Sequence, residues 1–159
     1  MNRVESAVGC FQSGGNCAQA ILSTYGQPYG LDESTALKLS AGFGGGMGRL
    51  GEVCGAVTGA FMVLGLHVGA ASAGDAQGKE RTYALVAEFA RRFEARRGCL
   101  HCRQLLGCDL NTPEGLQAAK DRKLFTTLCP CLVAEAATIL EEMLGPTQPG
   151  AGTGAVPHT

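Results

Sequence analysis

The chain has 159 residues, of which 45% are hydrophobic, and its formal net charge at neutral pH is −1. This length suits one domain with a substantial core and is too short for two comfortable domains. Lysine and arginine are scattered and tryptophan is absent, so the basic patch and the aromatic platform used by nucleic-acid-binding proteins are missing. We therefore expect no nucleic-acid partner.

Cysteine is the outlier in this composition. No apolar run follows the N-terminal residues 1–5, so a secretory signal is not indicated and we expect a cytoplasmic protein. Structural disulfides are rare in that reducing compartment, where cysteine enrichment favours metal binding or thiol redox chemistry. The eight cysteines are Cys10, Cys17, Cys54, Cys99, Cys102, Cys108, Cys129 and Cys131.

The first part of the chain predicts two short helices. Asn16 is a suitable N-cap for a helix that ends near Tyr25. After a breaker rich in glycine and proline, Asp32 is a suitable N-cap for a second helix through Leu39. Both helices are expected to bury their apolar positions in a shared core.

A glycine loop follows over residues 42–51, with the sequence GFGGGMGRLG. It lacks the Lys-Ser or Lys-Thr of a phosphate-binding P-loop. A dinucleotide fingerprint requires a preceding strand, and residues 36–41 predict a helix instead. An anion site built from Arg49 and the N–H groups of the loop stays open as an alternative.

The apolar stretch 53–73 predicts a buried central helix. Gly51, Gly55 and Gly59 are spaced four residues apart, which leaves one helix face without side chains and allows another backbone to approach closely. That backbone can belong to the same chain or to a second subunit, so a homodimer is open. The stretch approaches the length of a membrane span, but its glycine and alanine content and His67 favour a core helix. We therefore do not expect a membrane protein.

The rest of the chain continues the helical pattern, and no segment shows the alternation of a strand. The sequence therefore predicts an all-α fold: a compact, single-domain helical bundle over residues 1–145 with a buried Gly-rich central helix. Residues 146–159, rich in Gly, Pro and Thr, predict a disordered tail. The remaining predicted helices are 78–97, ended by Gly98, then 102–106, a segment beginning at Pro113, and 129–144.

Four cysteines lie at predicted helix starts. A helix N-terminus carries partial positive charge and free N–H donors, and both favour a thiolate, which is the nucleophile and the metal ligand. Four such positions can converge at one end of a bundle. The alternative is that each cysteine is simply a small buried hydrophobe. The four residues are Cys17, Cys54, Cys102 and Cys129.

Local cysteine pairs give weaker signals. Cys99 and Cys102 form a CxxC pair, which suits metal chelation or thiol exchange, and Cys129 and Cys131 form a CxC pair. No second CxxC lies at the spacing of a zinc ribbon. Auxiliary packing is the simpler interpretation for Cys10, Cys99, Cys108 and Cys131.

The histidines add little. His101 lies between Cys99 and Cys102 and is a candidate ligand or proton donor, although a solvated loop histidine is the simpler interpretation. His67 falls in the apolar central helix, where a satisfied core residue is expected.

Several of these features form an ordered set. CGAVTG at 54–59 is a CGAxxG motif, preceded by GGNCAQA at 14–20 and followed by CRQLLG at 102–107 and by Cys129. With the glycine loop included, the sequence resembles the C_GCAxxG_C_C family of redox-active proteins over about residues 14–144.

The resemblance implies a compact helical protein of prokaryotic, often anaerobic, metabolism. The signature cysteines of the family match the four at predicted helix starts. The family also looks related to the iron–sulfur part of split-Soret cytochrome c, which suggests a cluster. Haem is not implied, because Arg103 follows Cys102 where a haem attachment signature has histidine.

Three hypotheses remain open. The first is an electron-transfer or redox-sensing protein with a [2Fe–2S] or [4Fe–4S] cluster on Cys17, Cys54, Cys102 and Cys129 and a redox protein as partner. The second is a thiol–disulfide enzyme that uses Cys99 with Cys102, or Cys17 with Cys54. The third is a non-catalytic zinc protein with the same four ligands.

Overall fold

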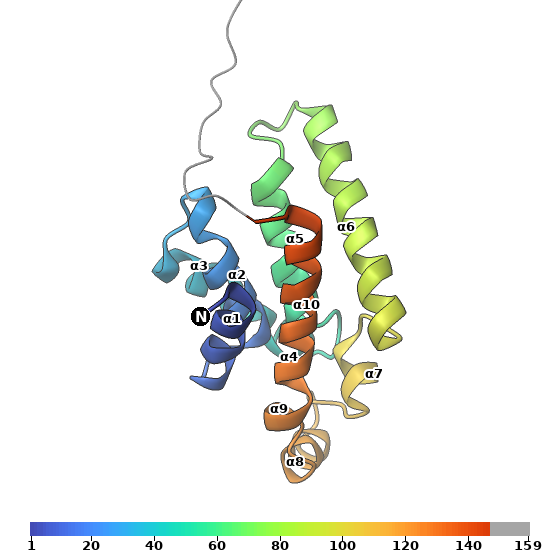
Figure 1. Cartoon of the computed structure of the whole chain (residues 1–159). Helices are drawn as coiled ribbons and strands as arrows, with labels where there is room; N and C mark the ends of the chain where they lie inside the picture. The colour runs from blue at the N-terminus through green and yellow to red at the C-terminus, as the bar shows by residue number, and fades with distance from the viewer. Residues whose placement is uncertain (147–159) are drawn as a thin grey trace, which may run out of the picture.

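The computed structural model describes residues 1–146, and in that range the chain forms helices and loops with no strand (Figure 1). The all-α prediction is confirmed, and the predicted tail lies outside the described residues except for Pro146. Two 3-10 helices, Gln27–Tyr29 and Ala41–Phe43, link neighbouring elements. The α-helices are α1 (Arg3–Gln12), α2 (Cys17–Tyr25), α3 (Glu33–Ser40), α4 (Gly44–Met47), α5 (Gly55–Val68), α6 (Ala76–Arg97), α7 (Cys102–Leu106), α8 (Pro113–Asp121), α9 (Leu124–Thr127) and α10 (Cys129–Leu144).

Helices α2, α5 and α10 pack against one another at the centre of the bundle, and α1 and α6 cover them. Ile21, Leu64 and Leu140 come from the three central helices and are fully buried. Burying such a side chain stabilises the fold by about 1.5–3 kcal/mol relative to leaving it in water. The core is therefore built mainly from these three helices. Their first residues lie at the same end of the bundle.

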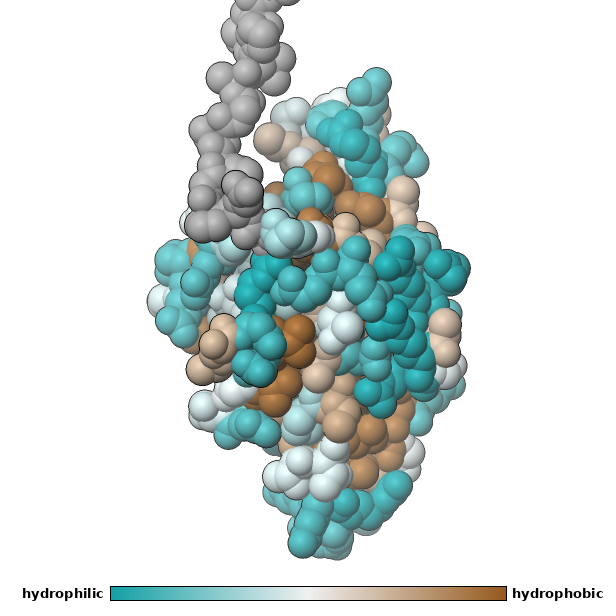
Figure 2. All heavy atoms as spheres, in the orientation of Figure 1, coloured by the Kyte–Doolittle hydropathy of each residue, from teal (hydrophilic) through white to brown (hydrophobic). Residues whose placement is uncertain are grey.

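Helix α6 has one apolar side and one charged side. Phe89 and Phe93 are fully buried against the core. On the outer side, Arg96 forms ion pairs with Glu135 at 2.9 Å and Glu142 at 2.7 Å, both on α10. Figure 2 shows the resulting hydrophilic surface. Exposed pairs of this kind contribute at most about 1 kcal/mol each, so burial of the phenylalanines holds α6 in place.

The close approach predicted for the central glycines occurs between α5 and α2. A Cβ added at Gly55 would lie 3.0 Å from the backbone nitrogen of Ala18, and one at Gly59 would lie 3.0 Å from the carbonyl oxygen of Ala18. Gly51 lies in the loop before α5, and an added Cβ at Gly65 would meet no atom within 4 Å. The glycine stripe is therefore short and is used within the chain.

Helix boundaries differ from the prediction at two places. Helix α5 ends at Val68 rather than near residue 73, and α6 begins at Ala76 because the Asp75 side chain caps it. Helix α1 was not predicted, although Val4, Ala7, Val8 and Phe11 recur at helical spacing and pack on the core. A capping box between Asn2 and Glu5 starts it.

One stretch, 124–144, is long and apolar enough to cross a membrane by length and composition alone. Half of its most apolar window is buried inside the protein. The core helix of a globular protein has the same composition, and α10 packs against α1, α2, α5 and α6. Helix α5, at 14 residues, is shorter than a span.

Tyr25 joins α2 to α10 through a buried polar contact. Its hydroxyl donates to Oε1 of Glu141 at 2.9 Å. The Arg3 guanidinium pairs with Glu141 at 2.8 Å and lies 4.9 Å from the centre of the Tyr25 ring. Burial, together with the hydrogen bond to Glu141, raises the pKa of the Tyr25 hydroxyl above its ordinary value of 10.0.

This pKa shift predicts a loss of stability in alkali. Above about pH 10 the unfolded chain ionises Tyr25 while the folded chain keeps it protonated, so the free energy of unfolding falls as the pH rises. Below that pH the hydroxyl is protonated in both states and its contribution is constant. Tyr25→Phe should therefore lessen the alkaline slope in urea unfolding, whereas Tyr83→Phe, at an exposed position, should not. Equal slopes in the wild type and Tyr25→Phe would contradict the prediction.

Candidate functional site

Four cysteines line a single cavity of about 110 Å³ at one end of the bundle. They are the four at predicted helix starts: Cys17, Cys54, Cys102 and Cys129. All four are buried, with exposed fractions between 2% for Cys54 and 9% for Cys17. The rest of the lining is mostly apolar: Phe11, Asn16, Gly45, Gly55, Leu106, Leu110, Phe125 and Leu132.

A short antiparallel contact brings Cys54 and Cys102 together, although 47 residues of chain separate them. The N–H of Cys54 donates to the carbonyl of Leu100 at 2.8 Å, and the N–H of Cys102 donates to the carbonyl of Glu52 at 2.7 Å. Between these bonds, Val53 and His101 form an isolated antiparallel bridge. These backbone hydrogen bonds therefore hold Cys54 and Cys102 close to each other.

The glycine loop packs between this bridge and α2. Gly46 has a φ of +65°, in the left-handed region, and a Cβ there would lie 2.8 Å from the Cβ of Cys102 and 2.5 Å from the carbonyl oxygen of Glu52. A Cβ at Gly44 would lie 2.7 Å from the Cβ of Asn16, the residue that caps α2. Glycine is needed at both positions because the loop backbone lies directly against the segments that carry the cysteines.

Cys17, Cys102 and Cys129 are the first residues of α2, α7 and α10, and Cys54 is the N-cap of α5, so the helix-start prediction is confirmed for all four. Cys129 is the first residue of α10, but Leu128 before it has helical angles, with φ −94° and ψ −50°. Helix α9 therefore runs almost directly into α10. Cys129 lacks the free N-terminus that its position beside Pro130 predicted.

The thiols are unequal in acidity. Hydrogen bonds with Cys129 and Cys54, together with burial, raise the pKa of the Cys17 thiol well above its ordinary value. The hydrogen bond with Cys17 lowers the pKa of Cys54, and the backbone N–H groups of Ala56 and Val57 act in the same direction against burial. Cys54 is therefore the thiol that ionises most readily within this contact, with Cys17 as its proton donor.

Burial raises the pKa of Cys102 to about 12, and the nearby Cys54 and Cys129 add to this shift. The expectation that each helix start favours a thiolate is thus wrong for Cys17 and Cys102. Burial and neighbouring thiols outweigh the partial charge of the helix terminus at both positions. A bound ligand that carries positive charge would favour the thiolate form of these cysteines, because thiolates bind it and thiols do not.

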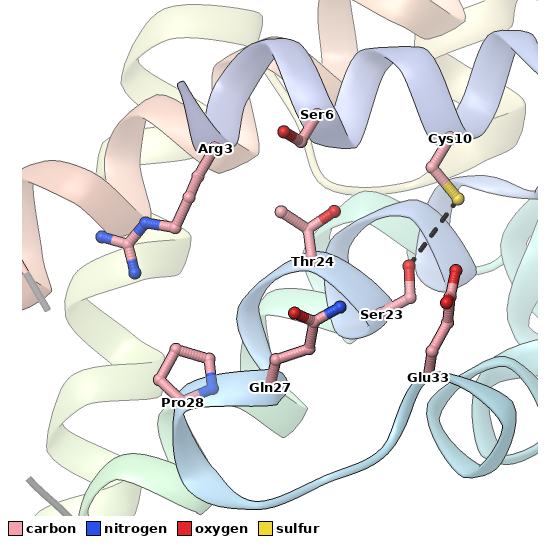
Figure 3. A pocket seen from close by; sticks show the side chains of 8 residues that line it. All are labelled: Arg3, Ser6, Cys10, Ser23, Thr24, Gln27, Pro28 and Glu33. Atoms are coloured by element: carbon pink, nitrogen blue, oxygen red, sulfur yellow. Dashed lines mark hydrogen bonds between the residues drawn. The ribbon is translucent and has the colours of Figure 1, made fainter. Parts of the chain in front are cut away.

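The other four cysteines lie outside this cavity. Cys10 faces α2 across a polar cleft, with its Sγ 3.6 Å from Oγ of Ser23 (Figure 3). Cys108 is buried and accepts a hydrogen bond from Arg122 at 3.3 Å. Cys99 is half-buried and Cys131 is exposed. All eight thiols are free, so Cys99 and Cys102 form no disulfide despite their CxxC spacing.

Neither His67 nor His101 belongs to the cavity. His101 is exposed, as the simpler interpretation of a loop histidine predicted, and it precedes α7. His67 is also exposed, so its prediction as a core residue is wrong. It lies in the last turn of α5, where its Nδ1 contacts the Tyr29 hydroxyl at 3.0 Å.

Sequence reasoning missed the walls of the cavity. Phe11 comes from the unpredicted helix α1, and Leu110 and Phe125 come from segments without a motif. No local signal marks them, because an apolar residue that faces a cavity looks the same in sequence as one that faces the core.

The four cysteines line a cavity, but their sulfurs do not converge on one position where a single metal ion could bind. Among residues 1–146, no three His, Cys, Asp or Glu side chains are grouped closely enough to hold one metal ion. A zinc ion with thiolate ligands needs each sulfur about 2.3 Å from the metal, so the four thiols would have to move together to bind it. A larger group inside the cavity would need less movement.

Comparison with protein-family models matches residues 15–143 to the family described as "Putative redox-active protein (C_GCAxxG_C_C)". No curated protein and no solved structure matches the chain, so the relation to split-Soret cytochrome c stays a prediction. The matched residues include all four cysteines of the cavity and the glycine loop. The chain belongs to the C_GCAxxG_C_C family of redox-active proteins.

Proposed function

We propose that this protein holds an iron–sulfur cluster on Cys17, Cys54, Cys102 and Cys129 and serves in electron transfer or redox sensing. The observation that carries the proposal is the meeting of four cysteines, from four separate segments, around one small buried cavity. Four thiolates are the usual ligand set of both [2Fe–2S] and [4Fe–4S] clusters. The cluster would supply reversible one-electron chemistry to this site.

The surroundings of the thiols support the same proposal. Phe11, Leu106 and Leu132 line the cavity and keep water from it, which affects the redox potential of a bound centre. The backbone N–H groups of Ala56 and Val57 lower the pKa of Cys54 and would therefore stabilise its thiolate. Because Cys17 and Cys102 bind as thiolates but are otherwise protonated, loading releases protons and should be weaker at low pH.

Anaerobic purification followed by iron and acid-labile sulfide analysis tests the proposal. We expect a brown protein with visible absorbance, and equal iron and sulfide content in the wild type and in Cys131→Ser, whose side chain is exposed and outside the cavity. The same result is expected after reconstitution with iron and sulfide under argon. A colourless product without iron from both routes contradicts the proposal, and stoichiometric zinc in its place supports the zinc hypothesis.

The pairing of Cys17 with Cys54 favours thiol–disulfide exchange as the second candidate. Both line the same cavity, and each shifts the other's pKa so that Cys54 is the more acidic thiol and Cys17 the proton donor. In this reaction the Cys54 thiolate attacks a substrate disulfide and releases one substrate thiol. The Cys17 thiolate then attacks the mixed disulfide, so the second substrate thiol leaves and a Cys17–Cys54 disulfide remains.

The same preparation distinguishes this candidate. A metal-free protein that loses the mass of two hydrogen atoms on mild oxidation, with Cys17 and Cys54 joined in the peptide map, supports exchange. A redox protein as partner stays a prediction under both candidates, and so does a homodimer.

A further inference from the structure

A second cavity, larger and more open to solvent, lies beside the cysteine cavity. This outer cavity has a volume of about 630 Å³. It is lined by residues of the glycine loop, α8 and α9, together with Asn16 before α2, Ala41 before the glycine loop and Leu110 before α8. The two cavities share part of their lining, so one layer of residues lies between them. The shared residues are Asn16, Gly45, Leu110 and Phe125.

The outer cavity is positively charged. Arg49 and Lys120 line it, and no acidic residue does. Both side chains are exposed, and neither forms a hydrogen bond or ion pair with any residue of the described range 1–146. Among the arginines this is unusual, since seven others pair with carboxylates: Arg3, Arg81, Arg91, Arg92, Arg96, Arg97 and Arg103.

The glycine loop holds Arg49 against the shared wall. A Cβ added at Gly45 would lie 3.1 Å from Cγ of Arg49, so the stem of the arginine crosses a residue that lines both cavities. Arg49 has a φ of +71°, which costs energy for a residue with a side chain. Its N–H donates to the carbonyl of Gly44 at 3.1 Å, which keeps this conformation.

Apolar side chains complete the lining. Leu110, Leu116 and Phe125 line the same cavity as the two cations. A ligand that fits both features has an anionic group and a short apolar body. The volume lies within the range of small-molecule sites, about 300–1,000 Å³.

We infer that the outer cavity binds a small organic carboxylate. The carboxylate contacts Arg49 and Lys120, and the apolar body packs against Leu110, Leu116 and Phe125. Arginine favours such a group because its guanidinium can donate two parallel hydrogen bonds to a carboxylate. The role of the ligand beside a redox centre rests on the proposed function, whereas its binding depends only on the residues of this cavity.

Calorimetric titration of the full chain with benzoate and with benzamide tests this inference. Benzoate carries a carboxylate on an apolar ring, and benzamide is nearly the same shape without the charge. We expect benzoate to bind at millimolar concentration or below, and benzamide to bind at least about tenfold more weakly, which corresponds to about 1.4 kcal/mol. The double variant Arg49→Gln/Lys120→Gln should weaken benzoate binding by about tenfold or more.

Lys38→Gln is the matched control, because Lys38 is an exposed lysine on α3 outside both cavities. It should leave benzoate affinity unchanged. The inference is overturned if millimolar benzoate gives no binding, if benzamide binds equally well, or if the double variant keeps the wild-type affinity.

Titrations of iron-loaded and metal-free protein separate the two proposals. Benzoate binding by a chain that never takes up iron removes the cluster and keeps the outer cavity as a carboxylate site. Iron uptake without benzoate binding removes the carboxylate site alone.

Discussion

Cys54→Ser should abolish iron binding after anaerobic reconstitution, whereas Cys108→Ser should keep the wild-type iron content. Cys54 lines the cavity, is 2% exposed and has the thiol that its neighbours make more acidic. Serine is nearly the same size but offers a hard hydroxyl in place of a soft thiolate, which iron–sulfur centres require. Iron and sulfide per chain, measured with visible absorbance, give the result directly.

Cys108 is the matched control because it is buried like Cys54, at 7% against 2% exposure, yet lies outside the cavity. Any loss of packing from a buried serine is therefore common to both variants. Cys10→Ser, which affects only the contact with Ser23, should also keep its iron. Equal iron in Cys54→Ser and Cys108→Ser, with unchanged helical circular dichroism, would contradict the ligand assignment.

Gly55→Ala is expected to destabilise the protein. The added methyl group would lie 2.8 Å from the carbonyl oxygen of Phe43, 3.0 Å from the nitrogen of Ala18 and 3.2 Å from Cβ of Cys17. Two of these atoms belong to the backbone and cannot rotate away. Overpacking of this kind costs about 1–3 kcal/mol. Urea unfolding of the reduced, metal-free protein measures the change in the free energy of unfolding.

Gly65→Ala on the same helix makes the opposite change. An added methyl group there meets no atom within 4 Å, and alanine favours a helix by about 0.5–1 kcal/mol over glycine. This variant should therefore be slightly more stable than the wild type. If both variants shift stability in the same direction and by the same amount, helix propensity alone governs α5 and the close packing of α2 on α5 is unimportant.

Local signals predicted most of the helices correctly. Asn16, Asp32 and Pro113 each begin a helix as expected, and Gly98 follows the end of α6. These signals work because capping and termination depend on residues within one turn of the helix end. Helix α1 was missed although its sequence carries the signals of a helix: Asn2 and Glu5 form a capping box, and Val4, Ala7, Val8 and Phe11 recur at helical spacing and pack on the core.

The choice of four cysteines out of eight also came from the sequence, through their positions at helix starts and the ordered family motifs. That choice agrees with the cavity, which none of the other four lines. The prediction that the helix starts make Cys17 and Cys102 acidic was wrong, because the pKa values of both thiols are raised. Acidity depends on burial and on neighbouring thiols from other segments, and neither is visible along the chain.

By itself, then, the sequence determined the helical fold, the family and the set of cysteines, because helix caps, apolar periodicity and motif order are local properties. Only the tertiary structure decided how those cysteines meet. The bridge between Val53 and His101 places Cys54 beside Cys102, and the contact of Gly55 with α2 places Cys17 beside Cys54. The charge at the outer cavity was equally hidden, since Arg49 and Lys120 are far apart in the sequence and line one cavity only in the folded chain.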